Sequence, residues 1–402
     1  MKSNASQRDF TSRPDIRIGS TECFDAEDWD FQGEHTQYLL HNLHPYPARF
    51  IPQIPRRAIS RWSRAGDLVL DPFCGSGTTL LEALLAGRDS IGVDNNSVAT
   101  LVASAKVANY SDSDFLELYE VRKRFSEVAK KPSSIRQVQQ TLLSTSTSYK
   151  IPEYNGREKW FSSDALSDLG WLRAQLDTLS LRPRLLALAV FSSLVVRASR
   201  QDSDTRYAAT NRTYRPGSAL KWWGKKMEDA ICRAREQSRK RPSAKSQVVV
   251  ADSRNLAFIP NSSIDLIVTS PPYLNAYDYH KYHRHRFHWI GDDFHFSRDT
   301  EIGKHDTFTK PHATPEPYFE DLRVCMTEWE RVLRPNSYAF VAVGDSIVSH
   351  SFVSVGDRLV ADAGSVGLSL ERRWVRNLDV TRKSFNPSSR IKREHLLLLK
   401  KG

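Results

Sequence analysis

Short apolar runs that end in an acidic residue alternate with helical stretches early in the chain. Residues 67–71 (DLVLD) are typical of a buried strand and lead into a glycine-rich turn, PFCGSG. Residues 78–86 (TTLLEALLA) predict a helix that Gly87 ends, and residues 90–94 (SIGVD) predict a second strand. Upstream, residues 51–62 (IPQIPRRAISRW) predict a helix whose prolines lie near its start, where they are tolerated. This order predicts a strand–helix–strand unit.

The strand pattern then stops for more than a hundred residues. Residues 105–241 have helical composition, and their most apolar stretch, RPRLLALAVFSSLVVRA, is too short and too Arg-flanked for a membrane span. An amphipathic helix is predicted within residues 317–335 and ends at Pro335. Strands are predicted again over residues 247–252, 264–270, 337–345 and 395–401. We therefore expect one α/β sheet interrupted by a largely helical insert, since the first unit alone cannot close a core.

Composition places the chain among ordinary globular proteins and adds one functional hint. The 402 residues are 40% hydrophobic and 26% charged, which excludes a disordered or collagen-like chain. The formal net charge is +11, so a polyanionic partner such as nucleic acid is favoured. The four cysteines are scattered, which argues against a disulfide framework or structural zinc and favours a reducing cytoplasm. No secretory signal or membrane span is predicted.

The glycine-rich turn is the first candidate site. It follows a strand, where parallel sheets bind ligands, and its glycines let a ligand approach the backbone closely. It lacks the GK[ST] of a Walker loop and is not GxGxxG, so neither a nucleoside triphosphate nor a dinucleotide is the first choice. Asp94, at the end of the next strand, is placed to accept hydrogen bonds from ribose hydroxyls. The alternative is a plain tight turn with a capping aspartate.

Four strings of residues resemble one family. DPFCGSGTT resembles motif I of the S-adenosylmethionine-dependent DNA amino-methyltransferases, and GVDNN resembles their motif II. TSPPY (269–273) resembles motif IV, and HPYPARF (44–50) is similar to the motif X segment. The resemblance implies a class I Rossmann-like methyltransferase sheet, mostly parallel with an antiparallel last strand. It also implies the alpha-like motif order: an arm (1–40), a cofactor half (41–105), a helical insert for target recognition (106–245) and a catalytic half (246–402).

The same resemblance implies the cofactor residues. S-adenosylmethionine is the expected cofactor, with its methionine part at the glycine turn, its ribose at Asp94 and its adenine amino group at Asp252. The candidate cofactor-binding residues are His44, Tyr46, Ala48, Phe50, Asp71, Phe73, Gly75, Ser76, Gly77, Asp94, Asn95, Asp252 and Ser253. The motif X residues His44 to Phe50 could instead be a Pro-rich connector with aromatic packing.

The TSPPY string suits methylation of an exocyclic amine, whose nitrogen is conjugated into the base and poorly nucleophilic. The Ser270 hydroxyl and the Pro271 carbonyl can accept its N–H bonds, while Pro271 and Pro272 stiffen the loop. Tyr273 offers a face for a base flipped out of the duplex. In the resembling family, serine in the first position favours cytosine N4 over adenine N6. Attack at cytosine C5 would need a cysteine nucleophile, and no Pro-Cys loop is present.

Basic and aromatic segments are the candidates for contact with double-stranded DNA. The histidines after TSPPY do not have the spacing of a zinc site, so no metal is expected. They could touch the base or phosphates, or simply pack. Basic side chains of the insert and of a loop near the C-terminus could meet the DNA backbone. The candidate DNA-binding residues are Arg206, Arg212, Arg215, Lys221, His280, His283, Arg382, Lys383, Arg390 and Lys392.

Several functions are compatible with these residues. A site-specific DNA methyltransferase acting on cytosine N4 leads, with adenine N6 as its alternative and a cognate restriction nuclease as a candidate partner. An RNA guanine-N2 methyltransferase shares similar motifs, but the first 40 residues are few for its usual RNA-binding domain. A DNA-binding regulator on a degenerate methylase fold is the non-enzyme alternative, and the intact glycine turn, Asp94 and Ser270–Tyr273 argue against it.

Overall fold

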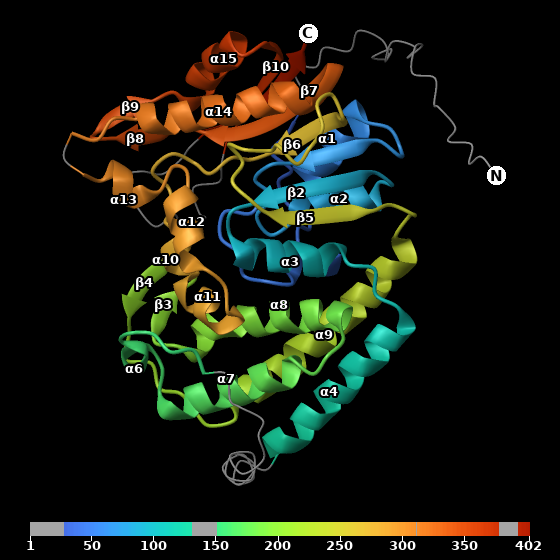
Figure 1. Cartoon of the computed structure of the whole chain (residues 1–402), viewed down its shortest axis with the longest axis vertical. Coiled ribbons are helices and arrows are strands. Elements are labelled where there is room, and N and C mark those ends of the chain that lie inside the picture. Colours follow the sequence, from blue (N-terminus) through green and yellow to red (C-terminus); the bar gives the residue numbers. More distant parts are fainter. Residues whose placement is uncertain (1–27, 131–150, 311, 378–392) are drawn as a thin grey trace.

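The computed structural model describes residues 28–130, 151–310, 312–377 and 393–402 (Figure 1). Its centre is one seven-stranded sheet in the order β10-β11-β7-β6-β1-β2-β5. The early strands are β1 (Leu68–Asp71) and β2 (Asp89–Asp94). The later ones are β5 (Ser246–Val250), β6 (Ile264–Thr269), β7 (Leu333–Gly344), β10 (Leu368–Asn377) and β11 (Arg393–Lys401).

The pairing of these strands confirms the predicted fold class. β1 is parallel to β2 and β6, β2 is parallel to β5, and β6 is parallel to β7. β11 is antiparallel to both β7 and β10, as expected of the last strand. Strands from before and after the insert therefore share one sheet, which is the class I Rossmann-like arrangement.

Helices cover both faces of the sheet, so the central strands are apolar on both sides. Along β6, Leu266 and Val268 pack in a cluster with α1 (Gln53–Trp62), while Ile267 packs in a cluster with α14 (Glu316–Val332). This alternation follows from the two-residue period of a strand and explains why β6 is buried throughout. α2 (Thr78–Leu85) follows β1, and α15 (Val355–Ser365) precedes β10.

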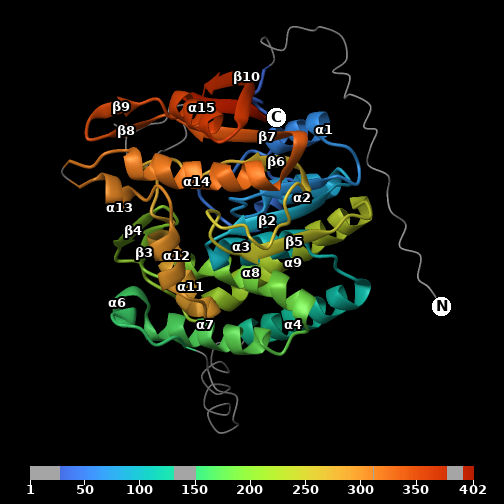
Figure 2. The same ribbon diagram turned by 45° about the horizontal axis from the view of Figure 1, so that its top comes forward.

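The insert is a helical layer against α3 (Ser97–Val107) on one side of the molecule (Figures 1 and 2). Val102 and Ala105 of α3 share a core cluster with Phe125, Val190 and Trp223, so the insert and the cofactor half have a core in common. Its domain boundaries stay a prediction. Its elements are α4 (Asp112–Lys130), α6 (Arg157–Trp160), α7 (Ser163–Leu176), α8 (Leu181–Ala198), β3 (Gln201–Ser203), β4 (Arg206–Ala209) and α9 (Ser218–Lys240).

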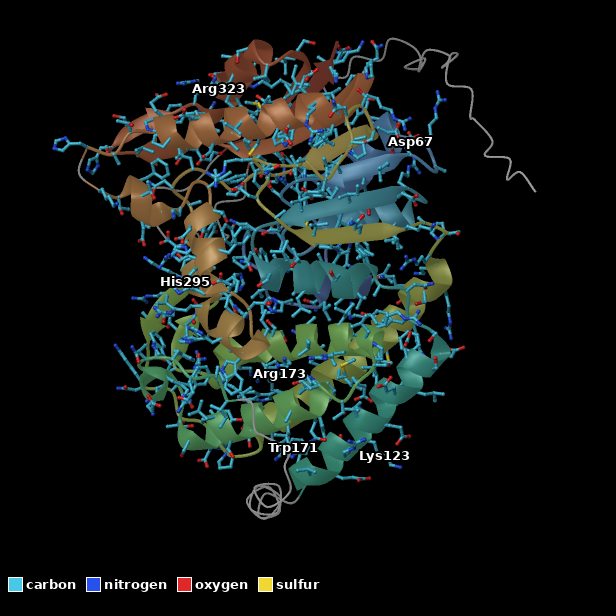
Figure 3. All side chains as sticks on the ribbon, in the orientation of Figure 1. Asp67, Lys123, Trp171, Arg173, His295 and Arg323 are labelled. Atoms are coloured by element: carbon cyan, nitrogen blue, oxygen red, sulfur yellow. The ribbon has the colours of Figure 1, made fainter. Side chains whose placement is uncertain are left out.

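A strip of short helices links β6 to α14 and contacts the insert. It contains α10 (Tyr279–Tyr282), α11 (Arg284–Ile290), α12 (Phe294–Thr300) and α13 (His305–Phe308). Arg173 of α7 donates to the Trp289 carbonyl of α11 at 3.1 Å, and Figure 3 labels this arginine within the insert. The remaining elements are η2 (Leu39–Asn42) and the hairpin β8 (Ser346–Val348) with β9 (Ser351–Val353). Among the described residues, no helix is long and apolar enough to cross a membrane.

Candidate active site

Polar residues follow the carboxyl ends of four neighbouring parallel strands. Asp71 ends β1, Asp94 ends β2, Asp252 follows β5 and Ser270 follows β6. Adjacent parallel strands place their carboxyl ends at one edge of the sheet, where open α/β folds bind ligands. In Figure 1 the arrowheads of β2 and β5 point to the side on which α10, α12, β3 and β4 lie.

The glycine turn packs tightly against α3 at Gly77 and less tightly against Tyr46 at Gly75. Gly77 has φ +78°, and a Cβ there would lie 2.8 Å from the Ala103 Cβ of α3. Gly75 has φ +48°, and the nearest atom to a Cβ there would be Tyr46 Cε1, at 3.7 Å. Both backbones favour glycine because side chains rarely adopt positive φ. The turn therefore keeps its backbone open to close approach at Gly75, with Tyr46 beside it, and the cradle predicted there for a small molecule stays a prediction.

Asp94 is held by the turn but keeps acceptor capacity. Its Oδ2 accepts from the Gly75 amide at 2.8 Å, and its Oδ1 accepts from the Asn96 amide at 2.9 Å. A carboxylate has about four acceptor sites, so about two remain for hydroxyl donors. Burial raises the pKa of Asp94 to about 7. This geometry fits the predicted contact with a ribose diol.

Asp71 is committed to its own neighbours. Its Oδ1 accepts from the Phe73 amide at 3.1 Å and from the Thr269 hydroxyl at 2.7 Å, so it ties β1 to β6 just before Ser270. Burial raises the pKa of Asp71 to about 6. The carboxyl group positions the glycine turn against the SPPY loop, and its direct contact with a cofactor stays a prediction.

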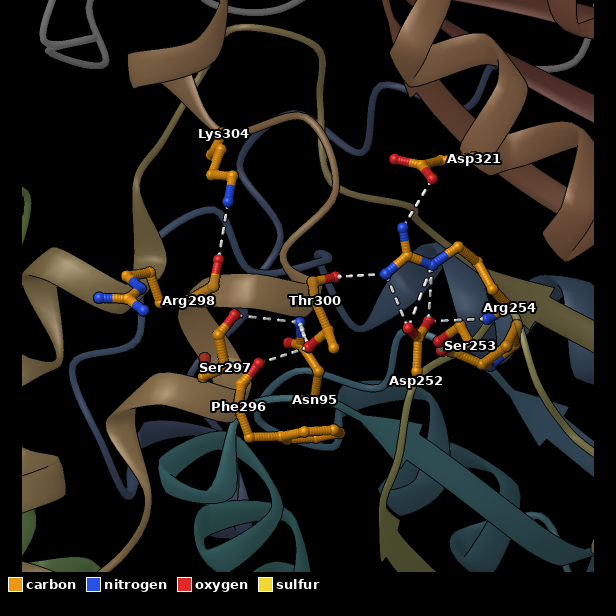
Figure 4. Close-up of polar contacts among 11 residues, drawn as sticks. Asn95, Asp252, Ser253, Arg254, Phe296, Ser297, Arg298, Thr300, Lys304 and Asp321 are labelled. Carbon is orange, nitrogen blue, oxygen red and sulfur yellow. Dashed lines mark hydrogen bonds and ion pairs between the residues drawn. The ribbon is translucent and has the colours of Figure 1, made fainter.

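The residues predicted near the adenine meet α12, as Figure 4 shows. Asn95 Nδ2 donates to Thr300 Oγ1 at 3.0 Å. Arg254 donates to the Asp252 carboxylate from its backbone amide and its guanidinium group, between 2.7 and 3.1 Å, and also pairs with Asp321 at 2.6 Å. Asp252 therefore has less acceptor capacity left than Asp94, and its predicted bond to an adenine amino group is the less well supported of the two. The neighbouring Ser253 hydroxyl donates to the Pro72 carbonyl.

The motif X residues separate in the structure. Tyr46 lies beside the glycine turn, and its contact with the cofactor stays a prediction. His44 is buried against the insert, with Nε2 at 3.3 Å from Ser192 Oγ, and Phe50 packs on the α1 cluster. Ala48 is exposed, with φ +49°. Of this group, Tyr46 is the residue that the structure brings to the turn.

Phe73 and Ser76 also turn toward protein neighbours. The Phe73 ring packs edge-on against Trp329, with centroids 6.4 Å apart. The Ser76 hydroxyl accepts from the buried Lys106 Nζ at 3.3 Å. Their roles at a cofactor therefore rest on the turn backbone, and remain predictions.

The SPPY loop is fixed through Tyr273. The Tyr273 hydroxyl donates to Glu394 Oε1, and Glu394 Oε2 pairs with Arg376 Nη1 at 2.6 Å. Ser270 also hydrogen bonds to the Tyr273 hydroxyl, and burial raises the pKa of Tyr273 well above its usual value. Because the tyrosine proton goes to Glu394, the Tyr273 oxygen is left as an acceptor to which the Ser270 hydroxyl can donate. The lone pairs of Ser270 Oγ then stay available as acceptors.

The second proline of the loop is anchored as well. The Pro272 carbonyl accepts from the Tyr318 hydroxyl of α14 at 3.0 Å. Thr269 and Pro271 are buried, and Ser270 is half-buried. The loop therefore presents a half-buried hydroxyl on a rigid backbone at the edge that also carries the glycine turn.

Comparison with known proteins agrees with this geometry. Residues 18–103 match the family model N6_N4_Mtase, described as DNA methylase. The chain is 24% identical over 402 residues to the Type II methyltransferase M.MjaII of Methanocaldococcus jannaschii, covering 79% of this chain and 75% of that protein. The chain therefore resembles the N6/N4 DNA methylase family, which supports a DNA amino-methyltransferase. It is also 32% identical over 115 residues to the DNA adenine methyltransferase YhdJ of Escherichia coli, covering 29% of this chain and 38% of that protein.

A solved structure similar to this methylase is a SAM-dependent methyltransferase from Methanosarcina mazei. The TM-score is 0.34 at 11% identity, covering 86% of this chain and 96% of that one.

The two histidines predicted to contact DNA, His280 and His283, are buried in the structure, and their contact with DNA stays a prediction. His283 is fully buried and stacks on Tyr46, with ring centroids 4.9 Å apart. His280 is also buried, with Nδ1 2.6 Å from Glu301 Oε2. The strip of short helices joins the insert to the site, and the rings of His280 and His283 pack within it. The part of the chain that the structure describes holds no group of three metal-ligating side chains.

The predicted basic residues of the insert lie on the surface of the methylase. Arg206, Arg212, Arg215 and Lys221 are all exposed. Arg206 begins β4, on the side of the molecule that carries the carboxyl edge of the sheet (Figure 1). Arg382, Lys383, Arg390 and Lys392 lie outside the described residues.

Sequence reasoning missed the residues that hold the SPPY loop. Glu394 and Arg376 come from β11 and β10, more than 100 positions after Tyr273. The one signal was an acid close before the four consecutive leucines of the strand REHLLLLKK. An unpaired buried acid is costly, so such a position predicts a buried partner but does not name it.

Proposed function

We propose that this methylase transfers a methyl group from S-adenosylmethionine to the N4 amine of a flipped cytosine in double-stranded DNA. S-adenosylmethionine is the cofactor of the family, and when bound it supplies an electrophilic methyl group. The cradle at Gly75 and the two free acceptor sites of Asp94 fit its methionine and ribose parts. Tyr46 closes the side of the cradle.

The observation that carries the mechanism is the hydrogen-bond polarity at Ser270. With the Tyr273 proton given to Glu394, the Ser270 hydroxyl can donate to Tyr273 and keep its Oγ lone pairs as acceptors for a substrate amine. Accepting an N–H bond from the amine at Ser270 Oγ, with a second at the Pro271 carbonyl, favours a tetrahedral nitrogen with a lone pair aimed at the methyl group. The fixed Tyr273 ring gives the flipped base a stacking face.

The choice of base rests on Ser270. Cytosine N4 and adenine N6 need the same acceptors, so the mechanism serves either base. Serine in place of aspartate supports cytosine, whereas the name of the YhdJ relative gives adenine as that protein's target. No Pro-Cys loop is present for attack at cytosine C5.

Product analysis tests the proposal directly. The purified protein is incubated with labelled S-adenosylmethionine and mixed-sequence duplex DNA, and the digested nucleosides are identified by mass spectrometry. N4-methylcytosine is the expected product. N6-methyladenine would overturn the base assignment alone, 5-methylcytosine would overturn the mechanism, and label in tRNA but not in DNA would replace the substrate.

A further inference from the structure

We infer that a cavity in the insert, lined by Arg197, Arg200 and Arg212, binds a phosphate group of the DNA backbone. The cavity has a volume of about 360 Å³ and lies away from the glycine turn and the SPPY loop. The inference rests on the proposed DNA substrate and adds a place where the strand is held. Besides the three arginines, the lining residues are Ser162, Ala198, Ser199, Thr213, Tyr214 and Trp222.

The three guanidinium groups are oriented by neutral partners. Arg197 lies over the Trp222 ring, 4.1 Å from its centroid. Arg200 Nη1 donates to the carbonyls of Glu158 and Lys159, at 3.3 and 3.1 Å. Arg212 Nη2 donates to the carbonyl of Asp202 at 3.0 Å. Each group is thus held in place while its charge stays uncompensated.

No acid lines the cavity, and within the described part of the chain none of these arginines pairs with a carboxylate. The nearby Asp168 is buried and committed, because its Oδ2 accepts from the Tyr214 hydroxyl at 2.5 Å and from the Gly217 amide at 2.7 Å. Three positive charges around one cavity repel each other. An anion that enters the cavity is attracted by all three and lowers this repulsion. Guanidinium groups match phosphate oxygens in pairs, and the hydroxyls of Ser162, Ser199 and Thr213 can add donors.

The position of the cavity favours DNA over a free anion. Arg200 directly precedes β3, and Gln201 of that strand donates to the Tyr282 carbonyl of the strip at 3.4 Å. The strip continues back along the chain to Tyr273 and the SPPY loop. Arg206 and Arg215 lie nearby in the sequence and are exposed. A DNA strand whose base enters the active site can therefore place one of its backbone phosphates at this cavity.

The salt dependence of binding tests the inference. Affinity for a fluorescent random-sequence duplex is measured by anisotropy over a range of about 50 to 300 mM salt, in which phosphate binding weakens steeply. The variant carries Arg197→Gln, Arg200→Gln and Arg212→Gln. The matched control is Arg323→Gln on α14, an exposed arginine labelled at the opposite end of the molecule in Figure 3.

The triple variant is expected to bind at least about tenfold more weakly, with the slope of log K against log salt shallower by about 0.9 for each phosphate that the variant no longer neutralises. The control should keep both values. An unchanged slope in a folded variant would overturn the inference, even with weaker binding, since it would make the cavity structural. If the triple variant does not fold, Arg197→Gln and Arg212→Gln are measured singly, because both side chains are exposed.

Two further measurements separate this inference from the proposed function. Binding of S-adenosylhomocysteine should be equal in the wild type and the triple variant. If the wild type binds S-adenosylhomocysteine and methylates DNA, but the wild type and the triple variant have the same salt slope, the phosphate site alone is overturned. A triple variant whose salt slope differs from that of the wild type with a duplex RNA probe, but not with duplex DNA, would also overturn it. So would a cavity at which inorganic phosphate stabilises the protein against heat while the three substitutions leave DNA binding unchanged.

Discussion

The Tyr273 hydroxyl of the SPPY loop donates to Glu394, a residue 121 positions further along the chain. This bond leaves the Tyr273 oxygen as an acceptor for the Ser270 hydroxyl, and the lone pairs of Ser270 Oγ then stay available for a substrate amine. Glu394 is itself held by Arg376 at 2.6 Å. The last two strands of the sheet thus set the proton arrangement at the candidate catalytic loop.

Removing the Tyr273 hydroxyl should affect turnover more than cofactor binding. Tyr273→Phe and Glu394→Gln should each lower kcat about 10- to 100-fold, the scale of losing a hydrogen bond to a charged group. Both changes break the same chain, so the double variant should be little worse than either single one. The rates are measured at saturating cofactor, and S-adenosylhomocysteine affinity serves as the control. Additive losses would show that the two residues act independently.

Ser270→Ala should reduce methyl transfer at least ~100-fold while leaving S-adenosylhomocysteine affinity unchanged. The hydroxyl supplies the acceptor that favours the reactive form of the amine. Single-turnover rates with pre-bound cofactor isolate the chemical step. A variant with near-normal turnover would rule out this role for Ser270.

Cofactor binding should strengthen as the pH rises through about 7. Burial raises the pKa of Asp94 to about 7, and the ionised carboxyl group is the form with free acceptor sites for the ribose. Below that pH the protonated group loses acceptor capacity, so affinity should fall by up to about tenfold for each pH unit. Calorimetry with S-adenosylhomocysteine from about pH 5.5 to about pH 8.5 brackets this range and is the measurement.

Asp94→Asn should bind more weakly at high pH and lose this dependence, whereas Asp71→Asn should keep it. The Asp71 carboxyl group also titrates near neutrality, with a pKa of about 6, so it is the matched control. A wild-type affinity that does not vary with pH would contradict the role of Asp94.

Asp71→Asn should stabilise the protein relative to the wild type as the pH rises from about 4 to about 6. The folded-state pKa of about 6 lies above the ordinary value of 3.8, so the folded protein binds the proton more tightly than the unfolded chain. Wild-type stability should therefore fall as the pH rises from about 4 to about 6, by about 2–3 kcal/mol. Asparagine can accept from Phe73 and Thr269 without ionising. The free energy of unfolding of the variant, measured by denaturant titration, should therefore rise relative to that of the wild type across this pH range. A difference between the two proteins that does not change with pH would refute this.

Gly77→Ala should destabilise the protein more than Gly66→Ala. Both glycines have positive φ, +78° and +86°, so both substitutions carry a similar backbone cost. At Gly66 nothing lies within 4 Å of a Cβ, whereas at Gly77 the Ala103 Cβ would lie at 2.8 Å. The extra loss should be about 1–3 kcal/mol, the scale of overpacking, as measured by chemical denaturation. Equal losses would show that α3 yields to the new methyl group.

The sequence predicted the sheet and the glycine turn well, because their signals are local. Apolar strands, a glycine pair and an acid at the next strand end follow one another within residues 67–94. It predicted the SPPY loop for the same reason. The partners of that loop were missed because Glu394 and Arg376 reach it only through long-range strand pairing.

Two other features could not be read from the local sequence pattern for similar reasons. His280 and His283 look like surface ligands in a basic stretch, but their burial depends on Glu301 and Tyr46, which the local pattern does not place nearby. The β3–β4 hairpin was hidden in a region of helical composition, since its strands are only 3 and 4 residues long.

The contact between Gly77 and Ala103 has a consequence for altering the target sequence of this methylase. α3 supports the glycine turn with one face and shares a hydrophobic core with the insert through Val102 and Ala105. An exchanged insert that repacks α3 would also displace the backbone that cradles the cofactor. An insert that reads the target sequence, as predicted, would therefore be tied mechanically to cofactor affinity, and a graft from a relative should carry α3 together with the helices that cover it.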